Sequence, residues 1–447
     1  MYEPDQYLIV GAGFSALATG LTLAAAGRKV IIIERDNQVG GLASDFELKN
    51  GTRLERFYHH WFKSDAEIFE LIHQLGLSSE IREITSRTGM YYNKSIWHLS
   101  EPLDLMRFSP LSFLSRLRLG FTVLWVRRFR NWKSIEHLSI REWLEPICGK
   151  EAYSVIWEPL VNAKFSDFAE EVSAAWMWKK LVLRGSSRNS AGAEVLCYFQ
   201  GGFGRLAEEM KKRIIELGGV FLLNEEVVEI EIADSVVAKV RTNTGKNFAP
   251  KATVFTGAPR ELATCLSGNF PFEWKYALNK IDYLGNICLI LVLNKSLSNT
   301  YWLNVNDPSF PFVGVIEHTN FVPISEFGNS HVVYLSRYLS PTHKEWTLND
   351  QDYTEKSIDY LRMMFPDFDS QTILSSYIWK APNAQPITSR SYSKSVREIE
   401  SPIKNLYFTS MAQVYPEDRG TNYAVRNAIK LVDRILSTEK TKNRDEK

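Results

Sequence analysis

The sequence predicts an α/β fold, and three features close to its N-terminus indicate it. Residues 7–10 form a short apolar run, the length of a strand that is buried on both faces. A glycine-rich segment, Gly11-Ala-Gly13-Phe-Ser-Ala16, follows directly. A second apolar run, residues 30–33, ends in Glu34. A strand, a glycine turn, a helix and a second strand that ends in an acidic residue make up a Rossmann-like dinucleotide-binding unit.

The glycine-rich segment contains the small residues that a diphosphate site needs. Gly11 permits the tight turn, Gly13 lets the backbone approach the diphosphate, and Ala16 lets the helix pack close to the strand. Phe14 and Ser15 lie between them, where the free N–H groups and the positive dipole end of the helix face the phosphates. We therefore expect all five residues to bind the cofactor.

The residues after the second strand indicate which cofactor this is. Glu34, 23 positions after Gly11, is placed to accept hydrogen bonds from ribose hydroxyls and to repel a 2′-phosphate, so NADP is disfavoured. A second glycine turn, Gly40-Gly41-Leu42-Ala43, is not needed for NAD but suits a longer cofactor, and it predicts FAD. Arg35 and Arg56 either neutralise phosphate or are ordinary surface cations. A structural turn without a ligand is the alternative, and it requires the whole ordered series to be accidental.

Length and composition limit the remaining possibilities. At 447 residues the chain exceeds one ordinary core, so two associated domains are expected, and a net charge of +1 gives no reason to invoke nucleic acid. The four scattered cysteines, without a C-x-x-C pair, are typical of reduced thiols in a cytoplasmic protein. The glycine turn begins too early for a signal peptide, and no apolar run of about 18 residues is present to span a bilayer. Residues 437–447 are polar enough to be disordered.

The nucleotide-binding fold is expected to be assembled from three separated segments, residues 1–93, 197–259 and 395–447. The second begins with Phe199-Gln-Gly201-Gly202-Phe203-Gly204 before a helix, and the third holds a strand, a loop and a last helix. Two insertions, a mostly helical one at 94–196 and a mixed one at 260–394, are predicted to form an α+β substrate domain. This arrangement places the active site where the insertions meet the cofactor sheet.

Taken in order, these segments resemble flavin amine oxidases, protoporphyrinogen oxidases and phytoene desaturases. The resemblance covers the whole chain but is specific only in the FAD-binding segments: the N-terminal series, residues 199–206 with the following helix and strands, and the closing strand, loop and helix. It implies that Val227 contacts adenine through its backbone, although strand packing explains Val227 equally well. Gly257, at the end of the strand 252–256, is expected at the same site.

The resemblance also implies a role for the last helix, which Glu417-Asp418-Arg419-Gly420-Thr421-Asn422 introduces. Its N-terminus would point at the pyrimidine edge of the flavin, where the helix dipole stabilises the negative charge that develops on reduction. The chain departs from the family pattern at Ser410-Met411, where amine oxidases usually carry Gly-Asp. Asp418 or Glu417 is therefore expected to contact the ribityl chain, and a solvated turn is the alternative for residues 417–419.

A second, local resemblance concerns Phe57-Tyr58-His59-His60-Trp61-Phe62-Lys-Ser-Asp65. This segment is similar to the histidine-bearing loop of UDP-galactopyranose mutases, with His59 on the first histidine of that motif and Phe62 in place of the second. The likeness implies that His59 lies against the flavin. Strand neighbours face opposite sides, so one of the two histidines is expected to meet the isoalloxazine, as a hydrogen-bond partner or a proton carrier near neutral pH. Tyr58, His59 and His60 are the catalytic candidates, and a packing pair beneath the cofactor is the alternative.

The segment 111–133 combines apolar and basic residues. Leu114, Leu117, Phe121, Leu124 and Trp125 recur at helical spacing among six basic residues and no acidic one. This pattern predicts a core helix with a solvated basic side. The alternative is a basic amphipathic helix that rests on an anionic membrane surface, or that admits a lipid-like or phosphorylated substrate.

Together these features predict an FAD-dependent oxidoreductase that abstracts hydride from a C–H or C–N centre of a small or lipid-like substrate. The sequence shows no metal-ligand spacing, P-loop or serine–histidine–aspartate series, which suits chemistry carried by a flavin. A mutase-like, flavin-dependent isomerase of nucleotide sugars is the alternative, motivated by residues 57–65. A flavin-binding scaffold without turnover is the third hypothesis.

Overall fold

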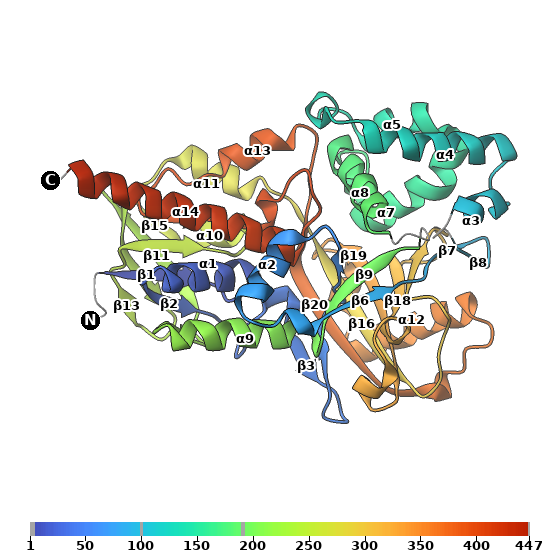
Figure 1. The fold of residues 1–447 in the computed structure, drawn as a ribbon, viewed down its shortest axis with the longest axis horizontal. Coiled ribbons are helices and arrows are strands. Elements are labelled where there is room, and N and C mark those ends of the chain that lie inside the picture. Colours follow the sequence, from blue (N-terminus) through green and yellow to red (C-terminus); the bar gives the residue numbers. More distant parts are fainter. Residues whose placement is uncertain (1–4, 99–101, 189–192, 446–447) are drawn as a thin grey trace.

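The computed structural model describes residues 5–98, 102–188 and 193–445 and has an α/β fold at its centre (Figure 1). Five parallel strands lie in the order β10-β2-β1-β14-β21. They are β1 (Gln6–Val10), β2 (Lys29–Ile33), β10 (Val220–Leu222), β14 (Ala252–Phe255) and β21 (Leu406–Phe408). Their short apolar runs are buried because other elements cover both faces of this central sheet.

Three helices cover one face of the central sheet: α1 (Phe14–Ala25), α9 (Gly202–Glu216) and α14 (Thr421–Asp445). Ile9 and Ile32 belong to the same hydrophobic core as Leu17 of α1 and Val425 of α14. Helix α1 lies close to the sheet because Gly20 has no side chain, since a Cβ atom there would lie 2.8 Å from Ile32 Cδ1.

A smaller sheet covers the opposite face. Its strands are β13 (Asn247–Phe248), β12 (Val236–Thr242), β11 (Val227–Ala233) and β15 (Leu266–Gly268), in that order. Leu8 and Ile31, which alternate with Ile9 and Ile32 along their strands, share a core with Val240 of this sheet. Helices α10 (Pro259–Cys265), α11 (Phe272–Asn279) and α13 (Tyr392–Glu398) complete that core.

The other half of the molecule is built on a seven-stranded sheet with the order β20-β16-β19-β18-β17-β7-β8. Its strands are β20 (Ile373–Pro386), β16 (Tyr283–Leu293), β19 (His331–Leu339), β18 (Gly314–Glu317), β17 (Trp302–Val305), β7 (Thr88–Tyr92) and β8 (Ser95–His98). Neighbours are antiparallel except β17 and β7. Cys288 and Ile290 of β16 join the core of the nucleotide-binding layers, whereas Leu289 and Leu291 pack with α12 (Asp350–Met364).

A helical layer lies beyond this sheet (Figure 1). It contains α3 (Pro102–Arg107), α4 (Phe113–Arg128), α5 (Ile140–Cys148), α6 (Lys150–Ala152), α7 (Glu158–Phe165) and α8 (Ala174–Ser186). Ser112, Ser139 and Ser173 cap α4, α5 and α8 with their hydroxyls, and Ser139 forms a capping box with Glu142. The described residues between 102 and 186 are therefore mostly helical.

Shorter elements connect the two halves. They are the hairpin β3 (Asp45–Glu47) and β4 (Arg53–Glu55), the helix α2 (Ala66–Gln74), and a sheet of β5 (Trp61–Phe62), β9 (Val195–Phe199) and β6 (Ile81–Thr85) in that order. None of the helices that the structure describes has the length and apolar character that crossing a membrane requires.

Two predictions about the surface are wrong. Leu114, Leu117, Phe121 and Leu124 do not face a core, because each is at least 48% exposed, and α4 buries Leu119, Thr122 and Val126 on its other side instead. Residues 437–445 are not disordered but continue α14. Glu439 holds this part of the helix by pairing with Arg28 at 2.7 Å and Lys251 at 2.9 Å.

Candidate functional site

Two glycine turns meet at the carboxyl edge of the central sheet. Gly13 and Gly40 pair as a parallel bridge, and the Gly40 N–H donates to the Ala12 carbonyl at 2.8 Å. A Cβ atom on Gly41 would lie 3.1 Å from the Gly13 Cα atom. The turns approach this closely because the glycines in contact have no side chains.

The first of these turns leaves the start of α1 open to an anion. Gly13 occupies the N-cap and offers no side chain to the first N–H groups, and no acidic residue lies in the first turn. Phe14, Ser15 and Ala16 are buried at this positive end of the helix. Gly11 has a φ of +97°, and a Cβ atom there would lie 2.6 Å from a neighbouring threonine hydroxyl. The turn therefore has the shape and polarity that a diphosphate requires.

Glu34, at the end of β2, binds to the same turn. Its Oε2 accepts the Ala12 N–H at 2.6 Å, and its Oε1 accepts the Asp36 N–H at 2.9 Å. Burial raises the pKa of this carboxyl, and the two N–H groups partly oppose that rise. Because each carboxylate oxygen keeps a further lone pair, Glu34 supports the turn and still has the capacity to accept ribose hydroxyls.

The two arginines that the sequence offers for phosphate are both paired with acidic residues. Arg35 lies 3.3 Å from Glu261, and Arg56 lies 3.2 Å from Asp36. The Arg56 guanidinium also stacks 4.4 Å from the centre of the Trp379 ring. Arg35 is mostly exposed, whereas Arg56 is held against the second glycine turn through a backbone bond to Ser44.

Three buried polar atoms beside the second glycine turn have no hydrogen-bond partner in the described part of the chain. They are Ser44 Oγ, Arg56 Nε and Trp379 Nε1. Buried polar groups are nearly always satisfied in folded proteins, so these three atoms are available to a polar ligand. Leu42 and Ala43 belong to this turn, the first exposed and the second buried.

Val227 and Gly257 lie at the same edge of the central sheet. Gly257 follows β14, which runs parallel to β1, so both strands end beside the first glycine turn. Val227 begins β11, two residues after Glu225, whose N–H donates to the Glu34 carbonyl at 2.9 Å. The structure thus brings the predicted residues of the first two segments together.

The start of α14 is bound to its neighbours through two side chains. Trp61 Nε1 donates to Thr421 Oγ1 at 2.7 Å, and Asn422 Oδ1 accepts the Ile68 N–H, in the first turn of α2, at 2.9 Å. These contacts position the N-terminal end of α14, just after Gly420, against the histidine-bearing segment and α2.

Two lysines pair with one carboxylate at this end of α14, and an arginine lies beside them. Lys164 Nζ of α7 and Lys180 Nζ of α8 lie 2.6 Å and 3.0 Å from Asp418 Oδ2. Arg419 instead donates to the Tyr338 hydroxyl at 2.6 Å and to a backbone carbonyl. Burial disfavours the Asp418 carboxylate, but the two lysine charges outweigh it and hold its pKa well below the usual range. Burial and the charge of Lys164 lower the pKa of Lys180 to about 7.

Glu417 also forms ion pairs with basic side chains. It pairs with Arg426 at 3.0 Å and with Lys179 at 3.5 Å. Both carboxylates that the sequence offers for the ribityl contact are therefore bound to cations, and positive charge exceeds negative charge at the start of α14. No sequence pattern marks Lys164 or Lys180, because they meet Asp418 only through tertiary packing.

His59 and His60 face different partners. Nδ1 of His59 donates to the Phe57 carbonyl at 2.6 Å, which leaves Nε2 as the acceptor of a neutral ring. Nδ1 of His60 pairs with the Tyr301 hydroxyl at 3.0 Å. Burial lowers the pKa of both histidines to about 4. Whereas the sequence suggests a proton carrier near neutral pH, both rings are neutral at about pH 7 and act there as hydrogen-bonding groups.

Tyr58 completes an aromatic wall, which we define as Tyr58, His60, Tyr301 and Trp302. The Tyr58 hydroxyl donates to Ser336 Oγ at 3.1 Å, and its ring lies 5.0 Å from Trp302, edge to face. His60 meets the same Trp302 ring at 5.5 Å. Burial raises the pKa of Tyr58 well above its usual value, so this wall carries no charge at neutral pH.

Glu55 is a buried carboxylate that sequence reasoning missed. It is 2% exposed, and its Oε1 accepts the Tyr198 hydroxyl at 2.7 Å and the Phe203 N–H at 2.9 Å. Burial raises its pKa, and these two donors oppose the rise. Glu55 thereby joins β4 to the first turn of α9. Gly202, in the glycine-rich segment at the start of α9, is the sequence feature that belongs to this contact. A Cβ atom there would lie 2.8 Å from Glu55 Oε1.

Phe203 links the glycine turns to the histidines. Its ring lies 6.3 Å from Phe14 at the start of α1 and 5.2 Å from His59. It also lies 4.3 Å from Trp61. A continuous series of rings therefore runs from the diphosphate turn to the catalytic candidates.

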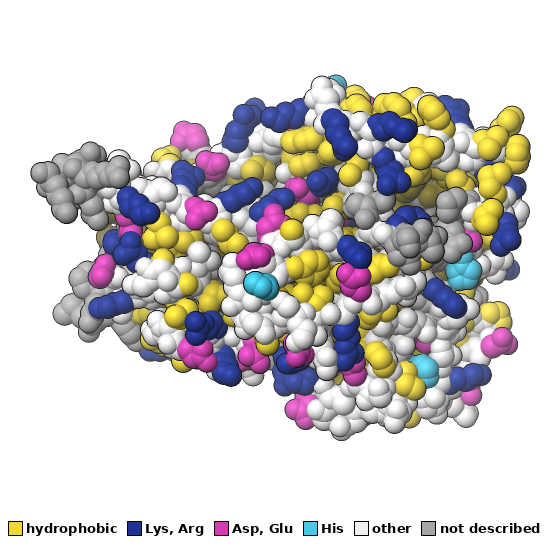
Figure 2. All heavy atoms as spheres, in the orientation of Figure 1, with side chains coloured by type: hydrophobic (Ala, Val, Ile, Leu, Met, Phe, Trp, Pro, Cys, Tyr) yellow, Lys and Arg dark blue, Asp and Glu magenta, His cyan; other side chains and the backbone are white. Residues whose placement is uncertain are grey.

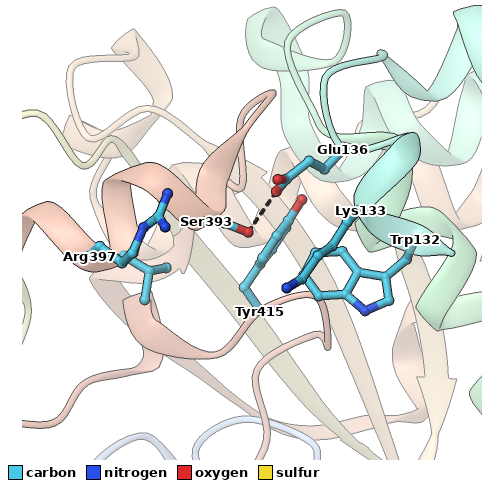
Figure 3. Close-up of a pocket in the computed structure, with 7 residues that line it drawn as sticks. Trp132, Lys133, Glu136, Ser393, Arg397 and Tyr415 are labelled. Carbon is cyan, nitrogen blue, oxygen red and sulfur yellow. Dashed lines mark hydrogen bonds between the residues drawn. The ribbon is translucent and has the colours of Figure 1, made fainter.

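A separate cavity of about 390 Å³ lies between the helical layer and α13 (Figure 3). Trp132, Lys133 and Glu136 line it from one side, and Ser393 and Arg397 from the other. Figure 3 shows the Glu136 carboxylate accepting the Ser393 hydroxyl, at 2.7 Å. None of the cofactor or catalytic candidates lines this cavity.

Comparisons with known proteins agree with this geometry. The profile of the family described as flavin-containing amine oxidoreductases matches residues 14–436. The chain is 22% identical to a 15-cis-phytoene desaturase of an Oncidium hybrid cultivar, over 91% of this chain and 73% of that protein. Its fold is similar to that of a protein assigned as a protoporphyrinogen oxidase from Exiguobacterium sp. 255-15, with a TM-score of 0.76 at 13% identity, covering 97% and 99% of the two chains. It is also similar to reduced UDP-galactopyranose mutase, with a TM-score of 0.77 at 14% identity, covering 98% and 95%.

The chain belongs to the flavin-containing amine oxidoreductase family. The predicted α/β fold, the resemblance and the FAD-dependent oxidoreductase class are thereby confirmed. The residues present fit the cofactor, because the open start of α1, the contact of the two glycine turns and the unpartnered polar atoms near Trp379 form one edge.

Proposed function

We propose that the protein abstracts hydride from a C–H or C–N centre of a small or lipid-like substrate held against the aromatic wall. The observation that carries this proposal is the series of rings Phe14, Phe203 and His59, which connects the glycine turns to the segment that contributes Tyr58 and His60 to that wall. FAD, when bound, supplies the hydride acceptor. The residues of the chain bind the cofactor, exclude water and orient the substrate.

Two features of the site support an oxidation. The wall is aromatic and uncharged at neutral pH. This suits a substrate centre that must stack against a ring system and be shielded from water. The positive end of α14, with Lys164, Lys180 and Arg419 beside it, favours negative charge at that end of the site. We place the reaction in the cytoplasm because the four cysteines are unpaired.

The purified protein is expected to retain FAD, and an anaerobic screen of amines, polyenes and porphyrinogens should bleach its flavin absorbance with at least one class. The His59→Ala variant should keep its FAD but be bleached more slowly, because it loses the ring that contacts Phe203. His137→Ala, an exposed histidine of the helical layer, is the matched control. A protein that takes up no FAD, or a His59→Ala variant that is bleached at the normal rate, would contradict the proposal.

A second prediction concerns Glu34. The Glu34→Gln variant keeps the shape of the side chain but loses its charge, so charge-assisted hydrogen bonds worth roughly 1.5–3 kcal/mol are weakened and the FAD dissociation constant should rise at least about tenfold. Titration with FAD, followed by flavin fluorescence, measures this change. Glu216→Gln, an exposed change on α9, should bind FAD as the unmodified protein does. Equal affinities of the two variants would show that Glu34 does not hold the ribose.

A mutase-like isomerase of nucleotide sugars is the second candidate, and the excess of cations around Asp418 favours it. Asp418 pairs with Lys164 and Lys180, Arg419 lies beside them, and an anionic substrate would balance the remaining positive charge. Because the pKa of Lys180 is about 7, binding of UDP-galactose should weaken as the pH rises through that value. Calorimetry on the FAD-bound protein tests this, with Lys164→Met expected to abolish binding. If calorimetry shows no heat of binding at any pH, the isomerase candidate is contradicted and the oxidase proposal remains.

A further inference from the structure

Helix α4 exposes a stripe of large apolar side chains. Leu114 is 77% exposed, Phe121 65%, Leu124 54% and Leu117 48%. Their spacing of three and four residues places them on one side of the helix. The opposite side, which includes Leu119, packs against α5 and α8. The stripe therefore has no partner within the described chain.

Neighbouring residues enlarge the stripe. Leu103 and Met106 of α3, which packs against α4, are exposed, as is Phe113 of α4. We call these seven residues the α4 patch. Figure 2 shows hydrophobic side chains gathered over the end of the molecule where α3 and α4 lie, with lysines and arginines among them. A contiguous exposed surface made of several large apolar side chains normally marks an interaction site.

Basic residues outnumber acidic ones beside the α4 patch. Arg127, Arg128, Arg130 and Lys133 are exposed, and no ion pair of theirs is found among the residues that the structure describes. Residues 111–133 contain no acidic residue. The Glu151 carboxylate near the start of α4 is occupied by the hydroxyls of Ser112 and Ser115. The surface thus combines exposed apolar side chains with uncompensated positive charge.

We propose that the α4 patch docks on the surface of an anionic lipid bilayer. The apolar stripe would enter the boundary between headgroups and acyl chains, and the four basic residues would meet the anionic headgroups. Charge complementarity selects this occupant, because an apolar contact with a second copy would bring the same four cations face to face. The patch lies on the bilayer rather than crossing it, since no described helix can span a membrane.

Flotation of the full-length, FAD-bound protein with vesicles tests the proposal. Vesicles of phosphatidylcholine with one third phosphatidylglycerol should carry the protein, and vesicles of phosphatidylcholine alone should carry much less. Binding should fall when the salt concentration rises from about 50 mM to about 500 mM, because salt screens exposed charges.

Paired variants separate the two contributions. Leu114→Ser/Leu117→Ser/Phe121→Ser should weaken binding at least about tenfold, and so should Arg127→Gln/Arg128→Gln/Arg130→Gln. Phe272→Ser/Met363→Ser/Leu374→Ser removes exposed apolar side chains outside the patch, and Lys212→Gln/Lys280→Gln/Lys394→Gln removes exposed charges elsewhere. Both control variants should bind as the unmodified protein does.

Three results would overturn the proposal. One is failure to float with anionic vesicles at low salt. Another is binding that persists in the apolar triple variant. The third is a dimer, seen by analytical ultracentrifugation, that this variant abolishes and that excess anionic vesicles do not dissociate, because the patch would then be an interface between copies.

Discussion

At the scale of single residues, His318 shows how the packed interior overrides ordinary side-chain chemistry. The ring is fully buried, and neither of its nitrogens has a hydrogen-bond partner in the described chain. It is enclosed by the rings of Tyr198 at 5.4 Å, Phe327 at 5.5 Å and Tyr334 at 5.8 Å. Burial lowers its pKa to about 3, so the folded protein keeps this imidazole neutral.

This residue predicts a loss of stability in acid. In the unfolded chain His318 binds a proton below about pH 6.5, whereas in the folded chain it stays neutral until about pH 3. Stability therefore falls as the pH drops below about 6.5, and one such group contributes roughly 2 kcal/mol of that loss by about pH 5. His318→Phe should reduce the fall of the melting temperature between about pH 7.5 and about pH 5. His98→Phe, an exposed position, should leave it unchanged, and equal falls in all three proteins would exclude the effect.

Residue-scale reasoning from the sequence was most reliable at the glycine turns. Gly11, Gly13, Gly40 and Gly41 are informative because short-range geometry decides their conformation. The protonation of His59 and His60 was not accessible in this way. Their pKa depends on burial, and burial depends on Tyr301, Trp302 and other residues far away in the chain.

At the scale of elements, the contact of Asp418 with Lys164 and Lys180 joins α7 and α8 to the loop before α14. Lys164 is buried and lies 4.9 Å from the centre of the Trp176 ring. A buried ion pair adds little when complete, but removing one partner leaves an uncompensated charge. The helical layer and the nucleotide-binding layers are therefore coupled at this point.

Asp418→Asn is expected to lower the free energy of unfolding by roughly 3–5 kcal/mol, because it leaves two lysine charges facing each other. Urea unfolding followed by circular dichroism measures the loss. The double variant Lys164→Met/Asp418→Asn should lose less than the sum of its single variants, since it removes a charge from each side of the pair. Asp433→Asn, exposed on α14, is the control, and strict additivity would mean that the pair does not couple these elements.

The elements themselves followed closely from the sequence. The strands of the central sheet are apolar runs between glycine turns, and their burial follows from that pattern. The orientation of α4 did not follow, because both of its sides carry apolar residues. Leu119 and Val126 face the neighbouring helices and Leu117 and Phe121 face outward, a choice that tertiary contacts make.

At the scale of the whole molecule, the two ends of the chain are held together. The start of β1 and the end of α14 lie at the same end of the molecule (Figure 1). Glu439 of α14 accepts the Tyr7 hydroxyl of β1 and pairs with Arg28 and Lys251. These contacts join residues from opposite ends of the sequence beside the central sheet.

Truncation tests whether these contacts of Glu439 stabilise the protein. A chain that ends at Ser437 loses Glu439 and should melt several degrees lower, since three contacts to the central sheet disappear. A chain that ends at Lys440 keeps them and should melt as the full chain does. Identical melting temperatures, measured by calorimetry on FAD-bound protein, would show that this end of α14 contributes nothing to stability.

The sequence by itself determined the α/β core, the dinucleotide turn and the class of cofactor, because each depends on residues that are neighbours in the chain. Only the tertiary structure decided which charges balance one another, as for Asp418 between two lysines, and which side of α4 is exposed. The physical reason is that burial and electrostatic balance are sums over contacts between distant segments, and no local pattern of residues contains those sums.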